Sequence, residues 1–167
     1  MEPIRLFSDD SAGAIFDPSR RYRYVLWRRW GSRTSRVLFV MLKPSTADEH
    51  VLDPTVRKCV KWAQRWGFGA LDVSNIFAWR STDPKALYKL EDPIGPENDR
   101  WIAETAALVA MTVVAWGKHG ALKSRGEAVA RMLERHRPYC LDVNGDGSPE
   151  HPLYIAAATK PKLWGAA

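Results

Sequence analysis

Four apolar segments of this sequence are each followed by side chains that can bind a ligand, hydrogen-bond or move a proton. In chain order these residues are Leu42, Lys43, Pro44, Ser45, Thr46 and Asp48; then Asn75, Phe77 and Arg80; then Trp116, Lys118 and His119; and finally His151, Pro152 and Tyr154. One polar segment end is ordinary. Four indicate a single ligand site if the segments are neighbouring strands, because ligands of open α/β sheets bind beyond the carboxyl ends of the strands.

The strands that must position these residues are predicted from apolar runs and from alternation. Residues 8–20 have the composition of a loop, and residues 22–30 alternate, which predicts a strand with one wet face. Buried parallel strands are predicted from the continuous apolar runs, at 36–42, 70–77, 111–116 and 138–142.

Helices are predicted between the strands. Residues 54–66 have helical spacing, with Asp53 as N-cap and Gly67 after the last turn. Further helices are expected from Pro84 (a short one), over 96–109, and over 121–135 with Ala128, Val129 and Met132 inward. The alternation predicts an α/β fold: a three-layer α/β/α sandwich with a central, mostly parallel four-stranded sheet, plus an N-terminal strand or hairpin.

Composition limits the class of protein. The chain has 167 residues, 46% hydrophobic and 26% charged, which predicts a single globular domain over 1–167 with its core at about 21–155 and peripheral residues 1–20 and 156–167. A net charge of +6 favours an anionic partner such as nucleic acid or a nucleotide. Some of the eight Trp are candidates for stacking on bases.

Seven short motifs resemble the bacterial DUF1643 domain, a family named for having no established function. They are MLKPSTAD, DPTVRKC, RWGFG, VSNIFAWRSTDP, DPIGPEND, AWGKHG and HPLY, and the resemblance as a whole extends from about Arg21 to Tyr154. Their layout is in turn similar to the uracil-DNA glycosylase superfamily. Those enzymes have a Gly-x-(Asp/Asn)-Pro loop after the first core strand, a base-reading Asn at a strand end, a Trp-Gly-x-His-like segment and a late His-Pro loop.

The second resemblance implies a glycosylase-like sandwich and a role for each matched position. Asn75 matches the base-reading Asn, and His151 with Pro152 matches the late loop. Lys43 stands where those enzymes keep the residue that positions the attacking water and where DUF1643 proteins usually have Asn, so it departs from both patterns. Met41 likewise falls where the glycosylases have Gly.

The implied chemistry is cleavage of an N-glycosidic bond, which builds positive charge on the sugar and negative charge on the base. An amide such as Asn75 can read a pyrimidine edge, and a histidine such as His151 can stabilise the departing anion. Phe77 or Trp79 would stack on a flipped base, with Leu42, Pro44, Ser45, Thr46, Trp116, His119 and Tyr154 also in contact with the substrate. The DNA backbone would lie on Arg80, Lys118 and Pro152.

Each of these residues also has a purely structural interpretation. Lys43 is open to three: a solvated loop lysine, a phosphate contact, or a nucleophile that attacks a sugar aldehyde. Asp48 is a general base or an exposed acid, and Ser45 and Thr46 cap a turn or bind phosphate. Asn75 satisfies backbone at a strand end if it does not read a base. His119 caps a helix or binds phosphate.

Several classes of site are not expected. No Cys-x-x-Cys pair occurs, and the run from Asp142 to Gly147 starts like an EF-hand but has Leu153 where the bidentate Glu belongs, so neither a metal nor any other cofactor is predicted. No apolar stretch is long enough to span a membrane, and no signal peptide is seen. We therefore expect a bacterial cytoplasmic monomer, associated with the nucleoid if it acts on DNA.

The sequence thus predicts a metal-independent DNA glycosylase acting on uracil or another modified base, with Lys43, Asp48 and His151 as catalytic residues. Two alternatives stay open. One is a module on the same fold that binds nucleic acid or a nucleotide without turnover, since Lys43 replaces the expected amide. The other is a hydrolase or transferase of free modified nucleotides.

Overall fold

The sheet at the centre of the fold extends beyond the four strands expected from the sequence. A computed structural model describes residues 11–31, 34–45 and 53–165. Its strands are β1 (Ala12–Phe16), β2 (Arg23–Arg29), β3 (Arg36–Met41), β4 (Ala70–Asn75), β5 (Met111–Val114), β6 (Tyr139–Cys140) and β7 (Lys162–Leu163). They form one mixed seven-stranded sheet in the order β1-β2-β4-β3-β5-β6-β7.

The strands of the sheet that carry the candidate residues run parallel. β3 lies between β4 and β5, and β6 follows β5, all in parallel pairings. The register aligns Met41 with Asn75 and Val40 with both Ser74 and Val114. The carboxyl ends of these strands therefore meet at one edge. The outer strands β1, β2 and β7 pair antiparallel, so the sheet is mixed.

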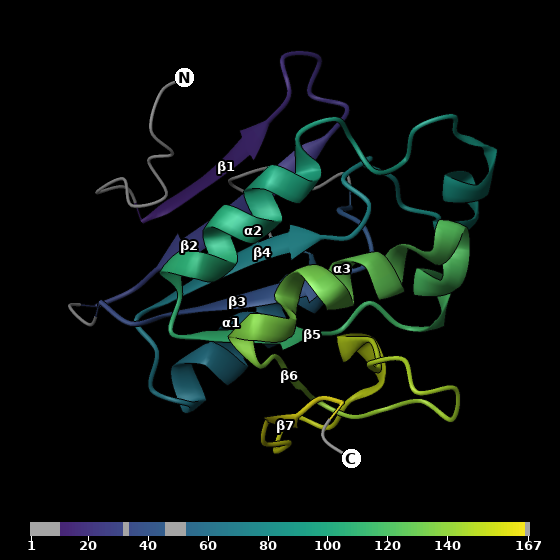
Figure 1. Ribbon diagram of the computed structural model, residues 1–167. Helices are drawn as coiled ribbons and strands as arrows, with labels where there is room; N and C mark the ends of the chain where they lie inside the picture. Colours follow the sequence, from purple (N-terminus) through teal and green to yellow (C-terminus); the bar gives the residue numbers. More distant parts are fainter. Residues whose placement is uncertain (1–10, 32–33, 46–52, 166–167) are drawn as a thin grey trace.

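Helices cover both faces of the sheet, which gives three layers (Figure 1). Helix α1 (Pro54–Arg65) lies behind the sheet in this view, and α2 (Asn98–Leu108) and α3 (Arg125–Leu133) lie in front. Successive side chains of β3 alternate between the two faces. Val37 and Phe39 pack in the same cluster as Trp62 of α1, whereas Leu38 and Val40 pack with residues of α2 and α3.

The start of α1 is set by its sequence, as predicted. The Asp53 carboxylate accepts a hydrogen bond from the Val56 backbone N–H at 2.8 Å, and Pro54 occupies the first turn, where its missing N–H leaves no bond unmade. The helix buries Val56, Cys59, Trp62 and Ala63 on one face. Gly67, with φ +87°, follows the last turn.

The N-terminal region contains the hairpin that the predicted fold allowed, but not the loop expected over all of residues 8–20. Residues 12–16, expected within a loop, form β1 and pair with β2. β2 has no wet face over Arg23–Trp27, because both of its sides are covered. The Trp27 indole lies directly over Gly13 of the paired strand. A Cβ at position 13 would come 2.0 Å from an atom of the ring, so the close packing of Trp27 on β1 requires glycine there.

The helix expected over 121–135 is broken. Residues Lys118–Ser124 form the irregular 3-10 segment η2, in which Lys123 has a left-handed backbone (φ 55°), and α3 follows. Ala128, expected to be buried, is exposed, whereas Val129 is buried as predicted. The other 3-10 helices are η1 (Pro84–Lys89), η3 (Glu134–His136) and η4 (Pro152–Tyr154). Every helix in the described ranges is too short or too polar to cross a membrane.

Candidate functional site

A cleft of about 790 Å³ opens at the carboxyl edge of the parallel strands. It is lined by side chains from all four of the segment ends singled out in the sequence. The predicted residues that line it are Leu42, Lys43, Ser45, Asn75, Trp116, Lys118, His119, His151 and Tyr154. The structure therefore brings the four segment ends together at one cleft.

Other predicted site residues lie elsewhere. Phe77 is completely buried in the core beneath α2 and α3, so it cannot stack on a ligand. Pro44 and Pro152 are buried beside the cleft without lining it, and Arg80 lies outside it. Thr46 and Asp48 fall outside the residues that the structure describes.

The cleft also contains residues that the sequence did not single out. Arg23 of β2, Asp53 before α1, Thr82, Asn144 and Glu150 all line it. Asp53 was read only as a helix cap. The sequence predicts Arg23 on a strand with a wet face, but its side chain is only 2% exposed because the residues around the cleft enclose it.

Asp53 connects the capped end of α1 to the cations of the cleft. One carboxylate oxygen accepts the Val56 N–H, and the other accepts the Ser45 hydroxyl at 2.8 Å. Burial lowers the pKa of Arg23 to about 10, and the nearby Asp53 charge opposes that effect. Two described carboxylates, Asp53 and Glu150, thus face three lining cations, Arg23, Lys43 and Lys118.

Lys43 is half-buried at the end of β3. Its ammonium group donates a hydrogen bond to the Ser81 carbonyl oxygen. Burial lowers its pKa, while Asp53 and Asp83 act in the opposite direction. This side chain is therefore fixed within the protein and is not simply a solvated loop lysine.

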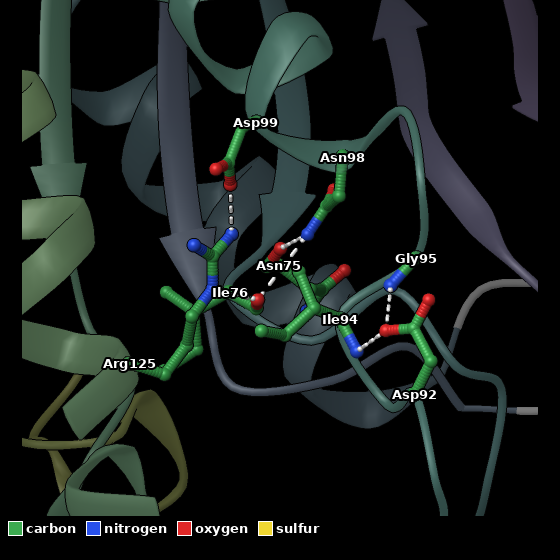
Figure 2. A network of polar contacts seen from close by, with 8 residues as sticks. All are labelled: Asn75, Ile76, Asp92, Ile94, Gly95, Asn98, Asp99 and Arg125. Carbon is green, nitrogen blue, oxygen red and sulfur yellow. Dashed lines mark hydrogen bonds and ion pairs between the residues drawn. The ribbon is translucent and has the colours of Figure 1, made fainter. Parts of the chain in front are cut away.

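Asn75 lies at the end of β4 and is supported from behind by a polar network (Figure 2). Its backbone carbonyl accepts a hydrogen bond from the Asn98 side-chain amide at 2.7 Å. The next carbonyl, of Ile76, accepts from Asn98 at 3.2 Å and from Arg125 Nε at 2.7 Å. Arg125 in turn forms an ion pair with Asp99. Helices α2 and α3 thus hold the strand end that carries Asn75.

Among the residues that the structure describes, the side-chain oxygen of Asn75 has no hydrogen-bond partner. The residue is only 1% exposed, and its Oδ1 is buried without a hydrogen bond. A buried polar atom left unpaired costs about 1–3 kcal/mol, so its presence asks for an explanation. Because Asn75 also lines the cleft, a ligand N–H that reaches Oδ1 would supply the missing bond.

His151 is held on the opposite side by the η4 turn. Its Nδ1 accepts a hydrogen bond from the Leu153 backbone N–H at 3.2 Å. Burial and the nearby Lys43 charge lower its pKa to about 4, against the opposing charge of Asp53. A neutral imidazole that accepts through Nδ1 carries its proton on Nε2. His151 is therefore a neutral hydrogen-bond donor near pH 7.

Lys58 of α1 fixes the turn that follows His151. Its ammonium group donates to the carbonyl oxygens of Ile155 at 2.8 Å and Pro152 at 3.0 Å, and a third carbonyl, of Leu153, lies at 3.4 Å. An ammonium has three donors, so these carbonyls account for all of them. Lys58 was not among the residues predicted from the sequence.

The Trp116–Gly117 segment forms a third side of the cleft. Gly117 has φ +75°, which favours glycine, and a Cβ there would lie 3.4 Å from the Cβ of His151. Trp116 is 3% exposed and packs edge-on against Trp164, with ring centroids 5.4 Å apart. It therefore shapes the cleft and presents little surface for stacking. At the rim, the exposed His119 ring hydrogen-bonds the Tyr88 hydroxyl at 3.1 Å.

The EF-hand-like run does not gather ligands for a cation. The Asp146 carboxylate accepts hydrogen bonds from Ser148, and the Asn144 amide donates to the Ser148 hydroxyl, so both serve a local turn. Within residues 11–31, 34–45 and 53–165, no three His, Cys, Asp or Glu side chains are grouped closely enough to hold a metal ion.

The chain belongs to the family described as Protein of unknown function (DUF1643), whose model matches residues 23–153. This covers the parallel strands and every residue that lines the cleft except Tyr154. No match was found among curated proteins or among solved structures. These comparisons give no support to the expected similarity to the uracil-DNA glycosylase superfamily.

Proposed function

We propose that the cleft binds a nucleotide unit of DNA and that the protein hydrolyses the N-glycosidic bond of uracil or another modified base. The observation that carries this proposal is that Asn75, whose buried Oδ1 has no hydrogen bond to the described residues, lines the same cleft as His151. Base edges offer N–H groups to such an acceptor. The positions of the motifs around one cleft also support our proposal that the fold is of the uracil-DNA glycosylase type.

In the proposed reaction, the C1′–N bond breaks and a C1′–O bond to water forms. The base leaves with the bonding electron pair, and the Nε2–H of His151 stabilises the negative charge on a base oxygen. The attacking water gives up a proton to a carboxylate. Asp48 is the sequence candidate for that role, and Asp53 is a described carboxylate in the cleft. A proton then returns to the base nitrogen.

A second candidate is a binding module without turnover, and the position of Lys43 favours it. A charged ammonium close to the sugar would oppose the positive charge that builds up there when the bond breaks. The Lys43 ammonium is also bonded to the Ser81 carbonyl. In this interpretation Arg23, Lys43 and Lys118 hold phosphate, and the nucleotide is recognised but not cleaved.

The test uses labelled oligonucleotides that carry uracil, hypoxanthine, xanthine or an abasic site, followed by alkali and a denaturing gel. A glycosylase produces an alkali-labile strand, and the cleaved oligonucleotide identifies the base. A salt-sensitive gel shift without cleavage supports the binding module. Borohydride treatment of the same samples tests Lys43, because a Schiff base with the abasic sugar is trapped as a covalent adduct that Lys43→Ala abolishes.

Variants assign the activity to this cleft. We expect Asn75→Ala and His151→Ala each to lower cleavage by about 10²-fold or more, in the range of a lost oxyanion-type donor. Thr105→Ala is the matched control, because Thr105 is also buried with an unpaired side-chain oxygen but lies on α2 within the core. Normal cleavage by both cleft variants would show that the reaction occurs elsewhere.

A further inference from the structure

The carboxylate of Glu150 is a hydrogen-bond acceptor that the protein itself leaves unused. Glu150 lines the cleft and is half-buried. Among the residues that the structure describes, none donates a hydrogen bond to its carboxylate or forms an ion pair with it. Carboxylates that are withdrawn from water are usually paired or hydrogen-bonded. This carboxylate is therefore available to a ligand, or to a water molecule held against the ligand.

The other described acid of the cleft, Asp53, is already engaged. One of its carboxylate oxygens accepts a hydrogen bond from the Val56 N–H and the other accepts from the Ser45 hydroxyl, each at 2.8 Å. These contacts cap α1 and hold Ser45 against its first turn. A proton placed on either oxygen would weaken them, because hydrogen bonds to a charged acceptor are the stronger ones. Glu150 has no such structural role.

The backbone on both sides of Glu150 is fixed. The Glu150 N–H donates to the Asp142 carbonyl at 2.9 Å, and the carbonyl of the preceding Pro149 accepts from the Gly117 N–H at 2.8 Å. The following residue, His151, is held by the η4 turn. The carboxylate is thus carried by a segment whose position is set before any ligand binds. Such preorganisation is what proton transfer inside a cleft requires.

Glu150 and His151 can act on different atoms of one ligand. They are consecutive, so their Cα atoms are about 3.8 Å apart. Both line the cleft, and the His151 backbone is extended (φ −69°, ψ 141°). Neighbouring side chains of an extended chain point in different directions. In the proposed reaction His151 contacts the departing base, which leaves the sugar and the attacking water to Glu150.

We propose that Glu150 accepts the proton of the attacking water when the N-glycosidic bond is hydrolysed. The inference rests on the proposed function and deepens it, because it names the base. The C1′–N bond breaks and its electron pair leaves with the nucleobase, while the water oxygen bonds to C1′ and a water proton passes to a Glu150 carboxylate oxygen. The nucleobase then takes up a proton at its nitrogen, and Glu150 returns its proton to water.

The test measures single-turnover cleavage of a short DNA strand that carries uracil, or hypoxanthine or xanthine if wild type releases that base instead. Glu150→Gln keeps the size and the polarity of the side chain but cannot accept the proton. We expect the rate constant at saturating protein to fall by about 10²- to 10⁴-fold, and the Kd for the strand to stay within about threefold of wild type.

Glu134→Gln is the matched control, because Glu134 is exposed on η3, does not line the cleft and loses the same charge. Its rate constant should stay within about twofold of wild type. Since the Glu150 carboxylate contacts no described residue, Glu150→Gln and Glu150→Ala should both melt within about 2 °C of wild type.

Chemical rescue separates a proton acceptor from a residue that only shapes the cleft. Glu150→Ala leaves a space in which added formate can bind and take the proton. We expect formate to raise the rate of Glu150→Ala by at least about tenfold. The same concentration should not change the rate of Glu150→Gln, because its amide fills the space.

Three results would overturn the inference. A wild-type rate for Glu150→Gln would remove Glu150 from the reaction and leave the proposed function standing, and a slow Asp53→Asn in the same assay would assign the proton to Asp53. A slow Glu150→Ala that formate does not accelerate would show that Glu150 is not the proton acceptor. If wild type cleaves none of the strands, the inference and the proposed function are rejected together.

Discussion

Asn75 and His151 line the same cleft but are held in opposite ways. The backbone of Asn75 is fixed from one face of the sheet by buried side chains, Asn98 of α2 and Arg125 of α3 (Figure 2). His151 is fixed from the other face by a turn, whose carbonyls accept hydrogen bonds from the half-buried Lys58 of α1.

This difference separates stability from site geometry. Breaking a buried polar contact leaves groups that water cannot reach, so the Asn75 side should be costly to disturb. The hydrogen bonds that Lys58 donates to the carbonyls of the η4 turn are only partly buried or exposed, so water can replace the lost donor more readily there. Changes on the His151 side should therefore disturb the site more than the fold.

The largest effect is expected from Arg125→Met. The variant keeps the length of the side chain but leaves the buried Ile76 carbonyl with one donor fewer and Asp99 without its partner. We expect the free energy of unfolding to fall by about 2–4 kcal/mol, as for other broken buried charge contacts. Urea unfolding monitored by tryptophan fluorescence measures it.

Asp99→Ala is the control for this prediction. The Asp99 side chain is 61% exposed, so its removal should cost no more than about 1 kcal/mol. If Asp99→Ala and Arg125→Met lowered the free energy of unfolding by similar amounts, the stabilising contact of Arg125 would be its ion pair with Asp99 and not its hydrogen bond to the Ile76 carbonyl.

His151 predicts a pH dependence of stability. Its pKa is about 4 in the folded protein, below the ordinary value of 6.5. Between these values the unfolded chain binds a proton that the folded chain does not, so stability falls as the pH drops from about 6.5 to 4. The loss attributable to His151 is at most about 3 kcal/mol.

His151→Asn isolates this contribution. The side-chain oxygen of the asparagine can still accept a hydrogen bond from the Leu153 N–H. Asparagine does not titrate in this pH range. We expect the difference in unfolding free energy between wild type and variant to change with pH below 6.5, in favour of the variant. Parallel curves from pH 7 to 4.5 would contradict the burial of a neutral His151.

Lys58→Met should have a smaller effect on stability and a local effect on structure. The methionine can still pack along Trp62, but the turn carbonyls lose their donors. We expect a loss of about 1–2 kcal/mol. Hydrogen exchange should accelerate at the Tyr154 and Ile155 amides and stay unchanged in β4. Equal acceleration in both places would mean that the two sides are not independent.

The convergence of the four segment ends was predictable, because apolar runs between helices define parallel strands and parallel strands share a carboxyl edge. The start of α1 was predictable from Asp53 and Pro54, whose roles are local. The hydrogen-bond network that holds the backbone behind Asn75 was not predictable from the sequence. Asn98 and Arg125 follow β4 by more than 20 residues, and nothing in their surroundings marks them as partners of its carbonyls.

The errors have physical causes of the same kind. β1 and β7 are short edge strands, which form because a neighbouring strand offers unpaired backbone groups. Phe77 follows the end of a strand, where an aromatic residue could stack on a ligand, but α2 and α3 cover its ring. Arg23 alternates with Tyr22 and Tyr24 as a solvent-facing residue would, but the residues around the cleft enclose it.

The smallest effect is expected from Asp53→Asn, which asks whether α1 supports the His151 side by geometry or by charge. Asparagine is as good an N-cap as aspartate, so α1 should start normally. In wild type the Asp53 carboxylate accepts a hydrogen bond from the Ser45 hydroxyl. In the variant the asparagine NH₂ group can donate to that hydroxyl instead. Only the negative charge near Arg23, Lys43 and His151 is lost. We expect a stability loss below about 1 kcal/mol and a further lowering of the pKa of Lys43, measured by ¹⁵N NMR titration.

Asp53→Ala, which also removes the cap, should cost about 1 kcal/mol more. If the two variants are equally unstable, charge and not capping is what Asp53 contributes to the cleft.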